Sequence, residues 1–138
     1  MKPDLELNLK GLFPDIIPLN LYFQCNDGWY ELIRTLCFQI TQEIAGTQLK
    51  FQVAQVKEKF GGLRFYYSWD SEPFDDSTSA NLKFYTVNGM VHFAESFSYK
   101  ICEICGNSGK LRQVNGWMTT QCDSCYNESV KSIKKEDK

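Results

Sequence analysis

The clearest pattern of hydrophobic and polar positions lies between residues 26 and 46. Hydrophobic residues recur there every three or four positions, at Trp29, Leu32, Ile33, Leu36, Cys37, Ile40 and Ile44. This spacing predicts an amphipathic helix whose hydrophobic face points to the core. Asn26 or Asp27 is a suitable N-cap, and Gly46 is a suitable stop.

Residues 49–69 are rich in β-branched and aromatic side chains, interrupted only by Gly61-Gly62. A two-residue Gly-Gly loop permits the positive φ angles of a tight turn, so this pattern predicts an antiparallel hairpin in which Lys59 faces Arg64. Directly opposed residues share a face. One face is then hydrophobic and carries Val56, Phe60, Leu63, Phe65, Tyr67 and Trp69. The other face carries Lys57, Lys59, Arg64 and Tyr66.

The remaining segments of the first hundred residues have weaker patterns. The segment up to Gln24 contains three prolines and alternating leucines, so we expect it to be extended or irregular. Residues 70–80 are acidic and polar, which predicts a surface loop. Leu82 to Val87 is expected to form a short strand. A helix should follow, with a hydrophobic stripe at Met90, Val91, Ala94 and Phe97.

The last third of the chain contains a cysteine pattern typical of metal sites. Cys102 and Cys105 form one C-x2-C pair, Cys122 and Cys125 form a second, and sixteen residues separate the pairs. Each pair offers two thiolates from one tight turn, and four thiolates complete a tetrahedral structural zinc site. This predicts one bound zinc ion and a reducing compartment, with Cys25 and Cys37 uninvolved.

The segment between the two cysteine pairs has the pattern of a hairpin. Asn115-Gly116 separates two short strand-like runs, and a helical pattern follows the second pair, with Tyr126, Val130 and Ile133 on one side. A C-x2-C turn, a hairpin and a second turn at a helix start is the order of a treble-clef finger; without the helix it would be a zinc ribbon. We therefore expect an α+β domain over residues 1–100 and a zinc-binding module over residues 101–138.

Composition narrows the classes of function. The chain has 138 residues, 43% hydrophobic residues and a formal charge of −2. This charge argues against a general nucleic-acid or membrane binder, because such binding needs a large excess of cations. No hydrophobic run approaches the roughly 20 residues of a membrane span. We expect a soluble, cytoplasmic protein with one main core.

Several stretches together resemble a family of small, uncharacterised proteins from bacteriophages and bacteria. These stretches are "CNDGWYELIRTLC", "QVKEKFGGLRFY", "AESFS" and "CEICG…GWMTTQCDSC", within roughly residues 14–127. The family shares a Gly-Trp helix start, a V-K-E-K-F-G-x-L-R-F-Y hairpin and a zinc-finger-like C-terminus. Its members often have His as the last ligand, where this sequence has Cys125. The resemblance brings no assigned activity, but a phage origin implies host takeover or defence evasion.

The cationic hairpin face has two interpretations. Lys57, Lys59 and Arg64 could be a solvated outer face whose charges prevent edge aggregation. Alternatively, Arg64 supplies a planar fork, the two lysines supply point charges, and Tyr66 supplies a stacking surface for a phosphate, a nucleotide or an acidic peptide. Glu58 falls on the hydrophobic face. At an edge it could simply reach solvent; if enclosed, it needs a cation, for which Arg34 is the best candidate.

The sequence offers little for catalysis. His92 is the only histidine, and no spacing links it to Cys25 as a thiol dyad. No phosphate-binding glycine loop is present. We therefore expect a non-enzymatic, zinc-containing binding protein, an adaptor or inhibitor acting on a host protein. The alternative is a binder of a small anionic ligand or nucleic acid through Lys57, Lys59, Arg64 and Tyr66; an enzyme is the third possibility.

Overall fold

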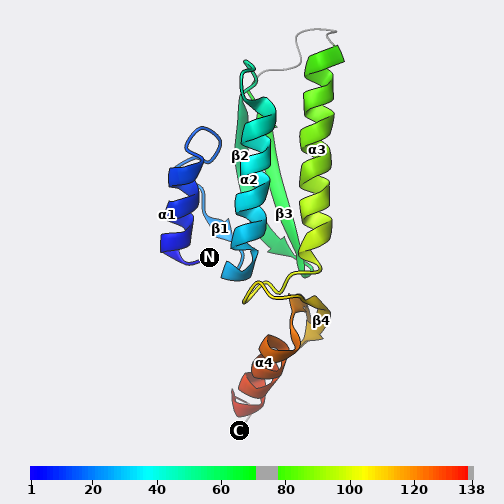
Figure 1. Cartoon of the computed structure of the whole chain (residues 1–138). Helices are drawn as coiled ribbons and strands as arrows, with labels where there is room; N and C mark the ends of the chain where they lie inside the picture. The colour runs from blue at the N-terminus through cyan, green and yellow to red at the C-terminus, as the bar shows by residue number, and fades with distance from the viewer. Residues whose placement is uncertain (71–77, 137–138) are drawn as a thin grey trace.

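The computed structural model describes residues 1–70 and 78–136, which form four α-helices and two small sheets (Figure 1). The first sheet has the order β1-β2-β3, with β1 at Phe23–Gln24, β2 at Phe51–Lys59 and β3 at Gly62–Trp69. β1 is parallel to β2, and β2 is antiparallel to β3. The second sheet pairs β4 (Lys110–Val114) with β5 (Trp117–Gln121). The expected α+β class is confirmed, although the first sheet is mixed rather than purely antiparallel.

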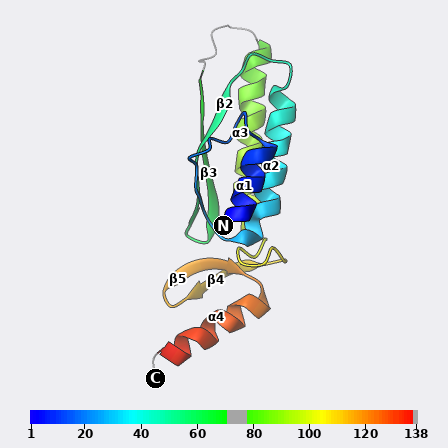
Figure 2. The ribbon, with the colours of Figure 1, turned by 90° about the vertical axis from the view of Figure 1, so that its left-hand side faces the viewer.

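The helix predicted after Asn26 is present and packs on the first sheet. A 3-10 turn at Asp27–Trp29 leads into α2 (Tyr30–Ile44). The predicted stripe faces the core, and its members Trp29, Ile33, Cys37 and Ile40 have no exposed surface. Figure 2 shows α2 and α3 on one side of this sheet, with its other side left open by both helices.

The strand expected at Leu82 to Val87 was wrong, because α3 (Thr78–Ser98) is a helix throughout. Val87, Val91 and Ala94 lie on one face of that helix and are buried. Packing therefore selects the helical period over the local strand propensity. Phe97, expected on the same stripe, is 44% exposed. Most of the loop expected over 70–80 lies outside the described residues.

The expectation of an extended or irregular N-terminal segment was also wrong, because α1 occupies Pro3–Leu12. Pro3 stands at the first turn of the helix, where its missing N–H needs no partner and its fixed φ suits the helix. Leu9, one of the alternating leucines, is fully buried. The prolines therefore begin and follow this helix rather than prevent it.

The β2–β3 hairpin turns one residue earlier than expected. Phe60 and Gly61 are the two turn residues, with φ of 54° and 80°, so Lys59 pairs with Gly62 and Lys57 pairs with Arg64. The expected turn and the observed turn both contain two residues. Lys57, Lys59, Arg64 and Tyr66 therefore still share one face of the hairpin. The expectation that Phe60 faces the core was wrong, because Phe60 lies in the turn and is 68% exposed.

Side chains of α3 accept hydrogen bonds from backbone N–H groups on the outer edge of β3. The Leu63 N–H donates to Ser98 Oγ, and the Phe65 N–H donates to Glu95 Oε1, both at 2.9 Å. An edge strand with free N–H groups is a template for pairing with another chain. Ser98 and Glu95 occupy these donors, so α3 protects this edge as well as covering one face of the sheet.

Candidate metal centre and its joint with the sheet

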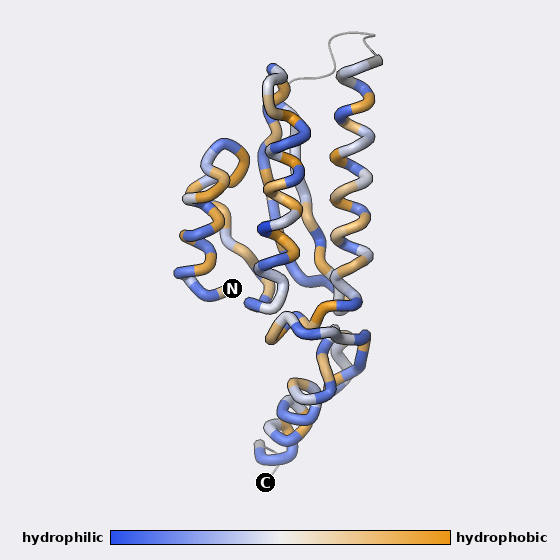
Figure 3. Tube along the Cα trace, in the orientation of Figure 1, coloured by the Kyte–Doolittle hydropathy of each residue, from blue (hydrophilic) through white to orange (hydrophobic). Residues whose placement is uncertain are grey.

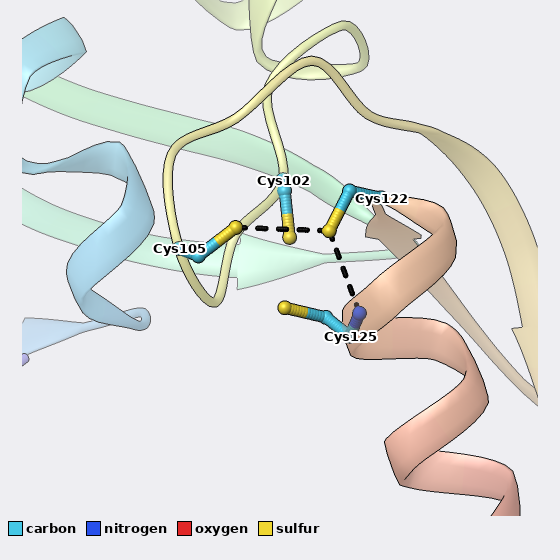
Figure 4. Close-up of side chains that lie close together, drawn as sticks. All are labelled: Cys102, Cys105, Cys122 and Cys125. Carbon is cyan, nitrogen blue, oxygen red and sulfur yellow. Dashed lines mark hydrogen bonds between the residues drawn. The ribbon is translucent and has the colours of Figure 1, made fainter.

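The side chains of the four cysteines predicted as metal ligands point toward one another (Figure 4). The Sγ atoms of Cys102, Cys105, Cys122 and Cys125 all lie within 4.8 Å of one another. All four are free thiols, and Cys105 Sγ lies 3.7 Å from Cys122 Sγ. This group could hold one metal ion.

Local backbone structure presents each pair of thiols. The Gly106 N–H donates to the Cys102 carbonyl at 2.8 Å, which closes the turn that carries the first pair, and Gly106 has a φ of 82°. Asn115 and Gly116 form the β4–β5 turn with φ of 48° and 84°. α4 (Asp123–Glu136) then begins directly after Cys122. The hairpin and the helix around the second cysteine pair are therefore where the sequence predicted them.

Arg112 fastens α4 to the β4–β5 hairpin. Its guanidinium pairs with Asp123 and lies 4.6 Å from the centre of the Tyr126 ring. Its Nε also donates to the Gln121 carbonyl at 3.0 Å. These contacts orient the first turn of α4, from which Cys125 projects.

The protonation states of the cysteines differ with their surroundings. The Cys125 N–H donates to Cys122 Sγ at 3.4 Å, and this bond lowers the pKa of the Cys122 thiol to about 7. Burial and the neighbouring thiols raise the pKa of Cys125, so the four cysteines of the cluster do not share one direction of shift. Burial also raises the pKa of Cys25 and of Cys37 to about 12, so these two cysteines are neutral parts of the core.

Hydrogen bonds join the cysteine segment to the first sheet and to the start of α2. Trp29 Nε1 donates to the Ile101 carbonyl at 3.0 Å, and the Gly28 N–H donates to the Glu103 carbonyl at 2.7 Å. Thr120 Oγ1 donates to the Gly61 carbonyl at 2.6 Å in a buried position. We call this contact region, formed by Gly28, Trp29 and Gly61 on one side and Ile101, Glu103 and Thr120 on the other, the joint.

Glycines make the joint possible. A Cβ on Gly28 would lie 2.1 Å from the Cys102 carbonyl oxygen, and one on Gly61 would lie 2.4 Å from Leu111 Cδ1. A Cβ on Gly62 would meet the Tyr99 ring at 2.3 Å. Gly28 and Gly61 therefore mark places where the cysteine segment approaches the body of the molecule, whereas Gly62 leaves room for Tyr99. Sequence reasoning assigned Gly61-Gly62 to the turn alone and missed this role.

Glu103 is a buried charged residue of the joint that sequence reasoning also missed. Its side chain accepts from both Asn26 N and Asn26 Nδ2 at 3.0 Å, and the residue is 5% exposed. Burial raises the pKa of its carboxyl. Its place between Cys102 and Cys105 gave no signal in the sequence, because the Asn26 partner is 77 positions away.

The structure brings the predicted cationic residues onto the open side of the first sheet. Lys57 Nζ lies 5.6 Å from the centre of the Tyr66 ring, and Lys59 Nζ lies 5.6 Å from that of Phe60. Arg64 donates to the Leu63 carbonyl at 2.8 Å and to the Tyr99 hydroxyl at 3.4 Å. Lys57 directly opposes Arg64, so a like-charge pair exists, but with a different lysine from the one expected.

Glu58 is half-buried and does not pair with Arg34, the partner expected if it were enclosed. Glu58 Oε1 accepts from the Gly61 N–H at 2.6 Å. Arg34 lies 3.4 Å from Glu31 on the same helix. Glu58 therefore fixes the hairpin turn, because its carboxylate satisfies a backbone donor that the turn leaves free.

Comparison of the chain with family models, curated proteins and solved structures found no match. Among the described helices, none has the length and hydrophobicity needed to cross a membrane.

Proposed function

We propose that the protein is a non-enzymatic binding protein in which Cys102, Cys105, Cys122 and Cys125 hold one zinc ion. The observation that carries this proposal is the gathering of four free thiols within 4.8 Å. Four-thiolate sites suit zinc or iron–sulfur chemistry, and two C-x2-C turns around a hairpin and a helix favour a treble-clef-like zinc finger. Four protein ligands leave zinc no open position for a substrate, which supports a structural role.

Zinc would hold the C-terminal segment in its fold and against the joint. The hairpin β4–β5 and α4 enclose few hydrophobic side chains of their own; Thr120 and Gln121 are buried where this hairpin meets the rest of the chain. Structural zinc contributes about 10–16 kcal/mol of apparent folding free energy in small modules. The ion would thus replace the hydrophobic core that a segment of this size lacks.

The partner in this proposal is a host protein, bound by an adaptor or inhibitor from a phage or mobile element. The resemblance to phage proteins supports this setting. Exposed aromatic residues support protein binding, because aromatic side chains are enriched at interfaces. Trp117, at the start of β5, is 79% exposed, and Phe60 is 68% exposed.

Affinity capture from a bacterial lysate tests the proposed partner. The wild-type protein should retain one host protein in fixed stoichiometry after a salt wash, and Trp117→Ala or Phe60→Ala should reduce its recovery. Leu19→Ala is the matched control, since Leu19 is 84% exposed but belongs to neither the β2–β3 hairpin nor the β4–β5 hairpin. The absence of any stoichiometric host protein would contradict this part of the proposal.

The alternative function is binding of a nucleotide or nucleic acid through Lys57, Lys59, Arg64 and Tyr66. The opposed pair of Lys57 and Arg64 favours it, because two neighbouring cations are best tolerated when an anion lies between them. Binding of a polyphosphate or an oligonucleotide should then weaken steeply as salt rises. An enzyme remains the third possibility; His92 is exposed on α3 and Cys25 is buried after β1.

Arg64→Ala tests the cationic face. It should weaken anion or partner binding and shift the thermal midpoint by only a few degrees, since, among the described residues, the half-buried Arg64 forms only hydrogen bonds to the Leu63 carbonyl and the Tyr99 hydroxyl. Arg34→Ala, which removes an exposed arginine from α2, is the control. Unfolding of the Arg64 variant without a separable binding defect would make the face structural, because Arg64 also bonds to Tyr99.

A further inference from the structure

The outer side of α3 carries hydrophobic side chains that no other described part of the chain covers. Leu82, Tyr85 and Phe93 are 65%, 75% and 67% exposed. Together with Gly89 they follow a spacing of three or four residues, which places all four on one face of the helix. We call Leu82, Tyr85, Gly89 and Phe93 the outer stripe. The opposite face of α3 packs on the sheet and α2, so hydrophobic residues recur along the whole helix (Figure 3).

The outer stripe itself contains no charged side chain, and the charged side chains of α3, Lys83 and Glu95, contact other elements of the chain. Lys83 Nζ pairs with Glu43 Oε1 at 2.9 Å, and Glu95 Oε1 accepts from the Phe65 N–H. With His92 neutral, Thr78–Ser98 contains no other side chain that is charged at neutral pH. A helix that is hydrophobic on both sides is normally buried on both sides. Exposed hydrophobic patches of this kind mark interaction surfaces.

Nothing in the described part of the chain explains why position 89 is a glycine. Glycine is less favourable than alanine inside a helix, because it loses more backbone freedom on folding. A Cβ built on Gly89 would meet no atom within 4 Å, and Gly89 is not among the glycines with positive φ. Neither packing nor backbone conformation therefore requires glycine here. A residue without a side chain does, however, allow another backbone to approach closely.

Gly89 also lines an apolar groove between α2 and α3 with a volume of about 380 Å³. The other lining residues are hydrophobic or uncharged: Leu32, Thr35, Leu36, Gln39, Met90, Phe93 and Ala94. Phe93 stands at the groove and stacks on Phe97, with ring centres 5.6 Å apart. One face of the molecule therefore offers both a groove and an aromatic ridge.

We propose that a second copy of this chain covers the outer stripe, with the two α3 helices antiparallel and crossing at Gly89. Gly89 lies near the middle of Thr78–Ser98, so a two-fold axis there pairs the helices over their whole length. Tyr85 and Phe93 are each four residues from Gly89, so Tyr85 of one copy faces Phe93 of the other. An uncharged face also meets its own copy without like-charge repulsion. This dimer is independent of zinc and of any host partner.

Sedimentation equilibrium of the full, metal-loaded chain over a range of concentrations tests this dimer. The wild type should be in reversible monomer–dimer equilibrium. Phe93→Glu and Tyr85→Lys should each weaken the dimer at least about 30-fold, the usual effect of losing a central aromatic contact. The double variant should recover much of this loss, because the introduced opposite charges face each other between copies. Within one copy these positions are eight residues apart on the helix and do not meet.

Trp117→Glu is the control, because it places the same charge at a 79% exposed aromatic position on the other sheet and should leave the dimer intact. Circular dichroism confirms that each variant is folded. A wild type that is monomeric at all concentrations overturns the proposal. So does a dimer that tolerates both single substitutions, and so does a double variant that associates no better than either single one.

Discussion

Gly61 shows how single residues set the contact between the two parts of the chain. Its φ of 80° suits the turn, its carbonyl accepts from Thr120, and a side chain would strike Leu111. The metal ligands were predictable from the sequence, because a C-x2-C turn is local and its spacing is visible. The partners of Gly61 and Glu103 were not, because these residues meet others that are far away in the chain.

Gly61→Ala should destabilise the protein by about 1–3 kcal/mol, since a non-glycine residue at this φ is strained and its Cβ has no space. Gly11→Ala is the matched control in α1, where a Cβ meets no atom within 4 Å. It should leave stability unchanged or raise it by up to about 1 kcal/mol. Urea denaturation measures both; equal effects of the two substitutions would contradict the packing described for Gly61.

Cys105→Ser should abolish metal binding and unfold the C-terminal segment, because three thiolates hold zinc much less tightly than four. Cys37→Ser is the control: Cys37 is buried in the core and lies outside the cluster, so the variant should keep its metal. Metal content and proteolysis of residues 101–136 report the result. A folded Cys105 variant with full metal content would remove Cys105 from the ligand set.

At the scale of helices and strands, a single hydrophobic face identified α2, whereas hydrophobic residues on both sides concealed α3 and prolines concealed α1. α2 has one stripe over several turns, which identified it. α3 has hydrophobic residues on both sides, so the run Leu82 to Val87 resembled a buried strand. α1 was obscured by its prolines, whose positions at and after the helix ends are compatible with it. The hairpin faces were right although the turn was one residue off.

Ile40→Ala should cost roughly 2–5 kcal/mol, because Ile40 on α2 has no exposed surface and its removal leaves a cavity. Gln39→Ala, on the exposed side of the same helix, should change stability by less than about 0.5 kcal/mol. Chemical denaturation of the two variants compares them directly. A loss below about 1 kcal/mol for Ile40→Ala would mean that this stripe does not pack as described.

At the scale of the whole molecule, the first sheet and its helices lie on one side, the cysteine segment lies on the other, and the joint lies between them (Figure 2). The joint explains why the Gly-Trp and Phe-Gly-Gly stretches occur in a chain that also has the four cysteines. The hydrogen bonds of the joint hold the cysteine segment and the first sheet in one orientation.

Removal of the metal should loosen the joint before the core of α2. The Gly28 amide, which donates to the Glu103 carbonyl, should exchange hydrogen faster once a chelator removes the ion. Amides inside α2, such as that of Ile40, should keep most of their protection. Uniform loss of protection along the chain would instead show that the protein unfolds as a single unit, without a separate response of the joint.

Metal analysis of the purified protein, by elemental measurement together with thiol counting, is the most direct test of the zinc centre. We expect one zinc per chain and no disulfide among Cys102, Cys105, Cys122 and Cys125. Protein prepared under reducing conditions that contains no zinc, that contains iron instead, or that forms disulfides among these four cysteines would contradict the zinc-held fold proposed here.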